Sequence, residues 1–135
     1  MVRKEAYQTI LRIFKDKEFS DTLLHQRAKR LKSDRANVAL FYNMVKGVVK
    51  LRGKLDYILS QHADEARFAA TDIKIKIWLY LGLYQLIYLD SIPAHAAINE
   101  TIKLAKENLG DKVGDFVHAL LSSWQRAPEV VYQTA

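Results

Sequence analysis

The fold is decided by residues 73–89, which read Ile-Lys-Ile-Lys-Ile-Trp-Leu-Tyr-Leu-Gly-Leu-Tyr-Gln-Leu-Ile-Tyr-Leu. An aliphatic residue occupies every second position from Ile73 to Leu83, and such alternation is typical of a β-strand. The apolar character continues to Leu89, however, whereas a strand usually has about five or six residues. A helix that is apolar on nearly all sides belongs at the centre of a bundle. We therefore predict a buried central helix, in which Gly82 allows a neighbouring helix to pack closely.

The residues on the C-terminal side of this helix contain further helix boundaries. Pro93 cannot continue a helix but is favoured in the first turn of the next one. A helix from about residue 93 to 109 then ends at Gly110, a residue typical of helix C-termini. A last helix begins around Asp111 and ends before Pro128.

The N-terminal side shows the same periodicity. Apolar residues recur every three or four positions over residues 2–17, which predicts a first helix. Ser20 can cap a second helix, and Asp34 a third of about sixteen residues. We expect a separate short fourth helix and a polar surface connection over residues 62–70; the fourth helix buries Leu55, Ile58 and Leu59. With two prolines and five glycines in 135 residues, the whole chain is predicted to be all-α.

Several classes of protein are excluded by composition. The chain has no cysteine, so it contains neither a disulfide nor a thiolate metal site, and it fits a reducing cytosol. Its first residues lack the apolar region of a secretory signal. Residues 73–89 are too short and too charged for a membrane span. We therefore expect a cytoplasmic protein that does not bind membranes.

Catalytic and metal-binding motifs are also absent from the sequence. The four histidines are far apart, and no cysteine or carboxylate lies at a spacing typical of zinc ligands. No P-loop, G-x-S-x-G or G-x-G-x-x-G motif occurs. We therefore predict no catalytic residue, no metal ligand and no cofactor site in this chain.

Positive charge is concentrated in one half of the chain. The net charge is +6, and residues 1–60 hold 14 Lys and Arg against 6 Asp and Glu. The remaining residues hold 7 against 9. Such asymmetry is typical of a surface that faces phosphates, although a solvated face that keeps the protein soluble gives the same count.

The third predicted helix separates its charged residues from its apolar ones. On a helical wheel its valines, Leu40, Phe41 and Met44 share one side. The other side carries Arg35, Lys46 and Lys50, which we call the cationic strip, with Asn43 and Tyr42 beside it. Arg52 is expected just beyond the end of the helix. We propose as RNA-binding candidates from this region Arg35, Tyr42, Asn43, Lys46, Lys50 and Arg52. The alternative is that these side chains only solvate the surface.

Three stretches carry a resemblance to a known family: Leu-Gly-Leu-Tyr-Gln-Leu at 81–86, Asp-Ser-Ile-Pro-Ala-His-Ala-Ala-Ile-Asn-Glu-Thr at 90–101, and Ala-Lys at 105–106. They resemble the NusB-like family, most closely the N-terminal NusB-like domain of RsmB (Sun/Fmu)-type rRNA cytosine-C5 methyltransferases. The resemblance covers essentially the whole chain. Two features depart from it: Tyr80 stands where the family usually has arginine, and the last helix lacks the usual asparagine and basic residue.

The resemblance implies an all-α bundle of about seven helices with RNA contacts near the start of the first. Arg3 and Lys4 are therefore further RNA-binding candidates. Asn99 and Glu100 match family positions, and we assign them a structural role, through hydrogen bonds that cap the start of their helix. Residues 1–127 would form the NusB-like domain, and residues 128–135 the start of a linker to a catalytic domain outside this chain.

The function implied is that of an RNA-binding accessory domain, whose partners are rRNA and its own catalytic domain, with no DNA expected. Two alternatives remain open. One is a free-standing NusB-type transcription antitermination factor, which binds a short RNA and a ribosomal protein. The other is a protein–protein docking module with an incidental cationic strip.

The absence of a cofactor site is testable on the isolated chain. The methyltransferase chemistry implied by the resemblance needs a cysteine nucleophile and S-adenosylmethionine on an α/β domain. This chain has neither a cysteine nor a Gly-rich strand–turn–helix. We expect calorimetric titration with S-adenosylmethionine to give no binding heat; micromolar binding would contradict an accessory role.

Overall fold

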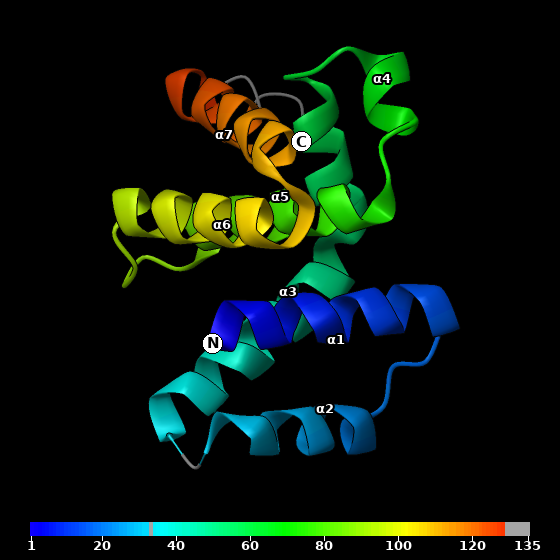
Figure 1. Ribbon diagram of the computed structural model, residues 1–135, viewed down its shortest axis with the longest axis vertical. Coiled ribbons are helices and arrows are strands. Elements are labelled where there is room, and N and C mark those ends of the chain that lie inside the picture. Colours follow the sequence, from blue (N-terminus) through cyan, green and yellow to red (C-terminus); the bar gives the residue numbers. More distant parts are fainter. Residues whose placement is uncertain (33, 129–135) are drawn as a thin grey trace.

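The computed structural model describes residues 1–32 and 34–128, and within them every regular element is a helix (Figure 1). The described residues form seven α-helices and one 3₁₀ helix: α1 (Val2–Asp16), α2 (Asp21–Ala28), η1 (Lys29–Leu31), α3 (Arg35–Ser60), α4 (Glu65–Ala69), α5 (Ile73–Tyr88), α6 (Ala94–Leu109) and α7 (Asp111–Arg126). The predicted all-α bundle of about seven helices is confirmed. The linker predicted for residues 128–135 lies, from residue 129 on, outside the described residues.

The helix that was ambiguous in the sequence is the centre of the bundle. Helix α5 packs against α1, α3, α6 and α7, and its residues 77–85 are all buried. Trp78 stacks on Tyr7 of α1 with 4.3 Å between the ring centroids. From Ile77 to Gln85 the helix is therefore buried on every side, and the predicted central helix is confirmed.

The helix boundaries have the local causes expected from the sequence. The Asp72 side chain accepts a hydrogen bond from the backbone of Lys74, which caps the start of α5. Ser20 caps α2 in the same way. Pro93 directly precedes α6, and Gly110, with a φ of 98°, ends it.

Two predicted elements were wrong. Helix α3 is one continuous helix of 26 residues, so the separate fourth helix does not exist. Gly53 is exposed and does not break α3. One glycine costs a helix only about 1 kcal/mol, and the buried residues of α3 before and after Gly53 stabilise the helix by more than that cost. Residues 62–70 are not only a surface connection, because α4 lies within them and buries Phe68. Helix α3 therefore runs through the molecule from α2 to α4 (Figure 1).

Two glycines let helices approach α5 closely. A Cβ atom on Gly47 of α3 would lie 2.2 Å from the Tyr84 ring, which packs directly against the backbone there. A Cβ atom on Gly82 would lie 2.5 Å from a methyl carbon of Leu121 on α7. The close packing predicted at Gly82 is confirmed.

Replacing Gly47 with alanine tests the contact between α3 and α5. We expect Gly47→Ala to destabilise the protein by about 1–3 kcal/mol, because the Tyr84 ring must move. The control is Gly53→Ala in the same helix, where an added Cβ meets nothing within 4 Å. That variant should be neutral or more stable by up to about 1 kcal/mol. Thermal unfolding that ranks the two variants in the opposite order would contradict the packing.

Candidate nucleic-acid interface

The cationic strip of α3 lies on the surface as predicted. Arg35, Lys46 and Lys50 are exposed, as is Asn43, while Tyr42 is partly buried. Among the residues that the structure describes, the three basic side chains form no ion pair. Their charges are therefore available to an anionic ligand.

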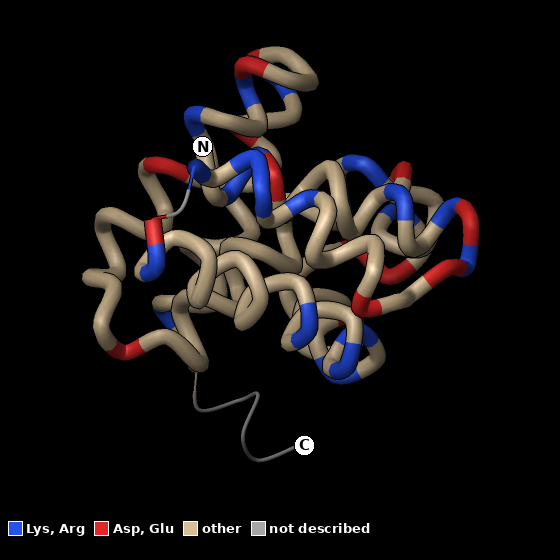
Figure 2. Tube along the Cα trace, turned by 90° about the horizontal axis from the view of Figure 1, so that it is seen from below, with Lys and Arg blue, Asp and Glu red and all other residues tan. Residues whose placement is uncertain are grey.

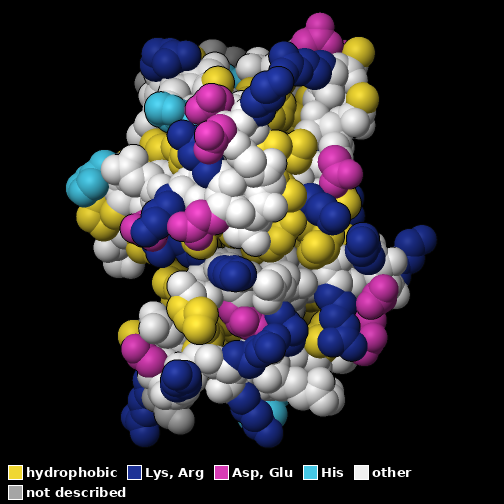
Figure 3. All heavy atoms as spheres, viewed as in Figure 1, with side chains coloured by type: hydrophobic (Ala, Val, Ile, Leu, Met, Phe, Trp, Pro, Cys, Tyr) yellow, Lys and Arg dark blue, Asp and Glu magenta, His cyan; other side chains and the backbone are white. Residues whose placement is uncertain are grey.

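Basic positions are not confined to this strip. Figure 2 shows Lys and Arg on all sides of the trace. Figure 3 shows more Lys and Arg than Asp and Glu side chains over α1 and α2 on one face of the molecule. Charge alone therefore does not select a binding face, and the shape of the surface has to be considered.

A groove between α2 and α3 lies beside the cationic strip. It has a volume of about 630 Å³ and is lined by Asp21, Thr22, His25, Gln26, Lys29, Tyr42 and Lys46. A smaller hollow of about 240 Å³ adjoins it and shares His25, Lys29 and Tyr42. We call the two together the α2–α3 groove. His25 and Lys29 could not be predicted from the sequence, because a helical wheel of one helix does not show which neighbouring helix lies beside it.

Helix α2 is held in place by a buried ion pair with α1. The Arg27 Nε atom lies 2.7 Å from a carboxylate oxygen of Glu5, which is 6% exposed. Arg27 also donates a hydrogen bond of 2.9 Å to the side chain of Gln8. The position of the α2 wall of the groove therefore depends on contacts with α1.

The Tyr42 ring contacts the buried Phe41 ring and the ammonium group of Lys46. Its ring meets the fully buried Phe41 ring edge-on at 5.7 Å between centroids. The Lys46 ammonium group, one helical turn further along α3, lies 5.5 Å from the centre of the Tyr42 ring. The aromatic ring and the positive charge are thus part of one surface.

Two other candidates from α3 make structural contacts. Asn43 accepts a hydrogen bond from the hydroxyl of Tyr84, so its side chain also joins α3 to α5. Arg52 does not lie beyond a helix end, because α3 continues past it. Its guanidinium group lies 4.2 Å from the centre of the Phe14 ring, on a different side of α3 from Lys50. Arg52 is therefore not part of the strip.

Arg52 lies beside a buried tyrosine. Tyr80 of α5 is fully buried and donates a hydrogen bond to the Asp56 carboxylate on α3. Burial, with a further contribution from Asp56, raises the pKa of Tyr80 far above its usual value, whereas Arg52 acts in the opposite direction. The position that departs from the family pattern is therefore a neutral hydrogen-bond donor between α5 and α3.

Arg3 and Lys4 have different environments. Arg3 is half-buried, and its Nε donates a 2.7 Å hydrogen bond to Gln85 of α5. The Gln85 amide nitrogen donates in turn to the Thr101 hydroxyl of α6 at 3.0 Å. Burial lowers the pKa of Arg3, and the Glu100 carboxylate opposes that shift. Lys4, in contrast, is exposed.

The family-matching residues of α6 do not cap that helix. Asn99 and Glu100 are exposed, and α6 has no side-chain cap at its start. The predicted capping hydrogen bonds are therefore wrong, because both residues lie more than one turn inside the helix. Glu100 instead acts on Arg3 through its charge.

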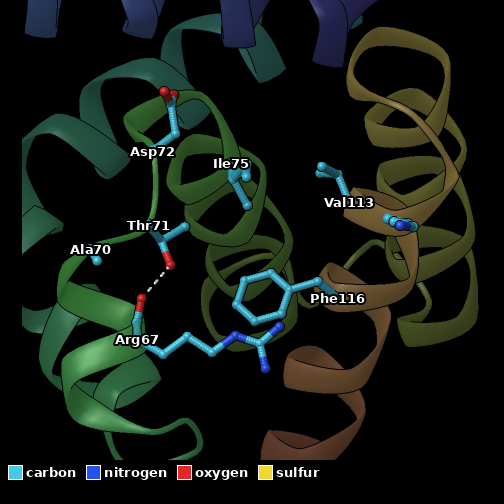
Figure 4. A pocket seen from close by; sticks show the side chains of 8 residues that line it. Arg67, Ala70, Thr71, Asp72, Ile75, Val113 and Phe116 are labelled. Atoms are coloured by element: carbon cyan, nitrogen blue, oxygen red, sulfur yellow. Dashed lines mark hydrogen bonds between the residues drawn. The ribbon is translucent and has the colours of Figure 1, made fainter.

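A second concavity lies between α4, the start of α5 and α7 (Figure 4). It measures about 440 Å³, and the Arg67 guanidinium group lies over the Phe116 ring at 5.1 Å from the ring centre. Asp72 and Lys112 give its rim both signs of charge. This lining and that of the α2–α3 groove each hold two cations and one carboxylate, but the groove shares Lys46 with the cationic strip of α3.

Two other kinds of feature, a metal site and a membrane-spanning helix, are absent from the described part of the chain. In residues 1–32 and 34–128, no group of three or more His, Asp or Glu residues is placed to hold a metal ion. Over the same residues, no helix has the length and apolar character needed to cross a membrane. The strip and its groove remain the candidate site.

The hydrogen bond of Arg3 predicts a loss of stability that its neighbour does not share. Arg3→Ala leaves the buried Gln85 carbonyl oxygen without its partner, and we expect a loss of about 1–3 kcal/mol in the free energy of unfolding. Lys4→Ala, at the adjacent exposed position, should change it by less than about 0.5 kcal/mol. Urea unfolding compares the two variants, and equal values would refute the structural role of Arg3.

Comparison with known proteins gives one family and two kinds of relative. The model of the NusB family matches residues 1–126. The chain is 30% identical over 129 residues to the probable ribosomal RNA small subunit methyltransferase B of Bacillus subtilis, covering 93% of this chain but 28% of that protein. It is also 31% identical over 124 residues to the transcription antitermination protein NusB of Bacillus licheniformis, covering 90% of this chain and 91% of that protein.

A second methyltransferase shows the same partial coverage. The probable ribosomal RNA small subunit methyltransferase B of Synechocystis is 37% identical over 86 residues, which are 64% of this chain and 19% of that protein. The chain thus spans less than a third of the methyltransferases it matches and most of the NusB protein. The NusB-family model matches residues 1–126, and a relative of each kind aligns with at least 90% of this chain, so this chain belongs to the NusB family.

Proposed function

We propose that this NusB-family domain binds RNA through the cationic strip of α3 and the groove beside it. The observation that carries the proposal is the set of three exposed basic side chains, Arg35, Lys46 and Lys50, that have no carboxylate partner among the described residues. Phosphate contacts dominate the affinity of proteins for nucleic acids, and they need such unpaired cations.

We further propose that the domain is the accessory part of an rRNA cytosine-C5 methyltransferase, in which it positions a separate catalytic domain on rRNA. The similarity to methyltransferase B of two organisms supports this setting, as do the Tyr-Gln-Leu and Ala-His-Ala-Ala-Ile-Asn-Glu stretches. The cysteine nucleophile and S-adenosylmethionine would then belong to the catalytic domain. This chain contributes binding and orientation, and acts in the cytoplasm.

A second candidate is a free-standing antitermination factor. It is favoured by the coverage of 91% of the Bacillus licheniformis NusB protein. The reading frame downstream of Ala135 distinguishes the two settings. A further domain with a cysteine motif would support the methyltransferase, and a stop codon would support the antitermination factor.

Charge reversal on the strip tests RNA binding. Each phosphate neutralised on single-stranded RNA contributes roughly −0.7 to the slope of log K against log salt. We expect the Lys46→Glu, Lys50→Glu double variant to bind an rRNA fragment more weakly and to flatten that slope by about one to one and a half units. Filter binding across a salt series measures both quantities.

A control variant separates the strip from the total charge. Lys74 and Lys103 are exposed on α5 and α6, and reversing both changes the net charge by the same amount. The Lys74→Glu, Lys103→Glu variant should keep a slope close to that of the unmodified protein. If both double variants behave alike, or if neither changes RNA binding, the strip is not the RNA-binding surface.

A further inference from the structure

We propose that the α2–α3 groove binds a single-stranded segment of RNA by stacking one base on Tyr42, with the flanking phosphates contacting Lys29 and Lys46. This inference rests on the proposed function, because it requires that the domain binds RNA. It adds a ligand class, unpaired nucleotides, and brings in Lys29 and His25 from the second wall of the groove.

The groove has the size and lining of a nucleotide site. Its larger hollow, of about 630 Å³, falls within the roughly 300–1,000 Å³ typical of small-ligand sites. Tyr42 lines both hollows, so its side chain is next to a ligand bound in either of them. Lys29 also lines both, and Lys46 lines the larger one.

The ring of Tyr42 is prepared for stacking by its surroundings. Its edge-on contact with the fully buried Phe41 restricts the ring without covering all of it. The Lys46 ammonium group lies over the Tyr42 ring, 5.5 Å from its centre, so a base that stacks on this face would displace the ammonium group toward a neighbouring phosphate. Aromatic side chains beside cations are the usual platform for bases of single-stranded nucleic acids.

The charges around the groove favour a phosphate backbone. Lys29 and Lys46 outweigh Asp21, which also lines the groove and opposes them. Lys50 lies one helical turn beyond Lys46 on α3, and Arg35 lies nearer the start of the same helix, so positive charge extends along α3 in both directions. A strand that places one base in the groove can therefore keep its neighbouring phosphates near cations.

The groove does not suit a duplex. In A-form RNA the base faces are stacked within the helix, and proteins read mainly the backbone and the shallow minor groove. The Tyr42 ring, on the α3 wall of this groove, can stack only with a base that is already unpaired. We therefore expect single-stranded RNA to bind more tightly than a duplex of the same length.

Tyrosine variants test the stacking. The probe is a short single-stranded RNA that carries a fluorescent purine analogue, whose emission reports stacking as well as binding. Tyr42→Leu should weaken binding by at least about fivefold, the lower end of what one stacked base contributes. Tyr42→Phe, which keeps the ring, should bind within about twofold of the unmodified protein. The control Tyr57→Leu removes an exposed tyrosine outside the groove on the same helix, and should have no effect.

A base-free ligand separates stacking from charge. An oligonucleotide of the same length with abasic central positions keeps the phosphates, so the unmodified protein and Tyr42→Leu should bind it equally. Lys29→Glu should weaken binding of both ligands without changing the thermal midpoint, because Lys29 is exposed. This variant keeps the test valid if Tyr42→Leu is found to lower the midpoint.

The outcomes separate this inference from the proposed function. If Tyr42→Leu and Lys29→Glu bind the labelled RNA normally while reversal of Lys46 and Lys50 weakens it, RNA binding stands and the groove inference is wrong. Equal affinity for duplex and single strand, with no change on loss of the Tyr42 ring, would also overturn it. If none of these variants changes binding, both proposals fail.

Discussion

The packing of α3 against the buried helix α5 is the constraint on which the rest of this structure depends. The Tyr84 ring packs on the backbone at Gly47, and its hydroxyl donates a hydrogen bond to Asn43. Buried residues recur along α3 from Phe41 to Leu59, so one face of the helix is committed to the core over several turns. That commitment fixes the rotation of α3 about its own axis. Because successive residues of a helix are rotated by about 100°, fixing one face also fixes where Arg35, Lys46 and Lys50 point. The cationic strip is a consequence of the core.

A second constraint acts at the start of α1. Arg3 would be free to meet a ligand if it were a surface residue, but its hydrogen bond to Gln85 joins α1 to α5, and Gln85 reaches Thr101 of α6. A buried glutamine without partners would destabilise the core, so the Arg3 guanidinium has a structural role whatever else it binds. Loss of RNA binding on mutation of Arg3 would therefore combine a structural effect with a direct one. Mutation of the exposed Lys4 or Lys46 would report the direct effect alone.

Local patterns in the sequence predicted most helices but not the relations between them. Pro93 and Gly110 bound α6 where the sequence predicts, and the length of residues 73–89 distinguished helix from strand. The continuity of α3 past Gly53 was missed, because packing on both sides of that residue outweighs a small local penalty. The burial of Arg3 depends on a residue 82 positions away, and the groove on the faces that α2 and α3 present to one another. No single-helix pattern contains either fact.

If the groove binds RNA as proposed, it would let a helical bundle distinguish among RNA ligands. Charges on an exposed strip attract any polyanion, and the attraction weakens with salt in proportion to the phosphates contacted. The proposed stacking on Tyr42 would add a requirement for an unpaired base, which charge cannot supply. The ring belongs to α3, while Lys29 and His25 reach the groove from the other wall. Because the Glu5–Arg27 ion pair holds α2 against α1, the width of the groove depends on helix packing rather than on a flexible loop.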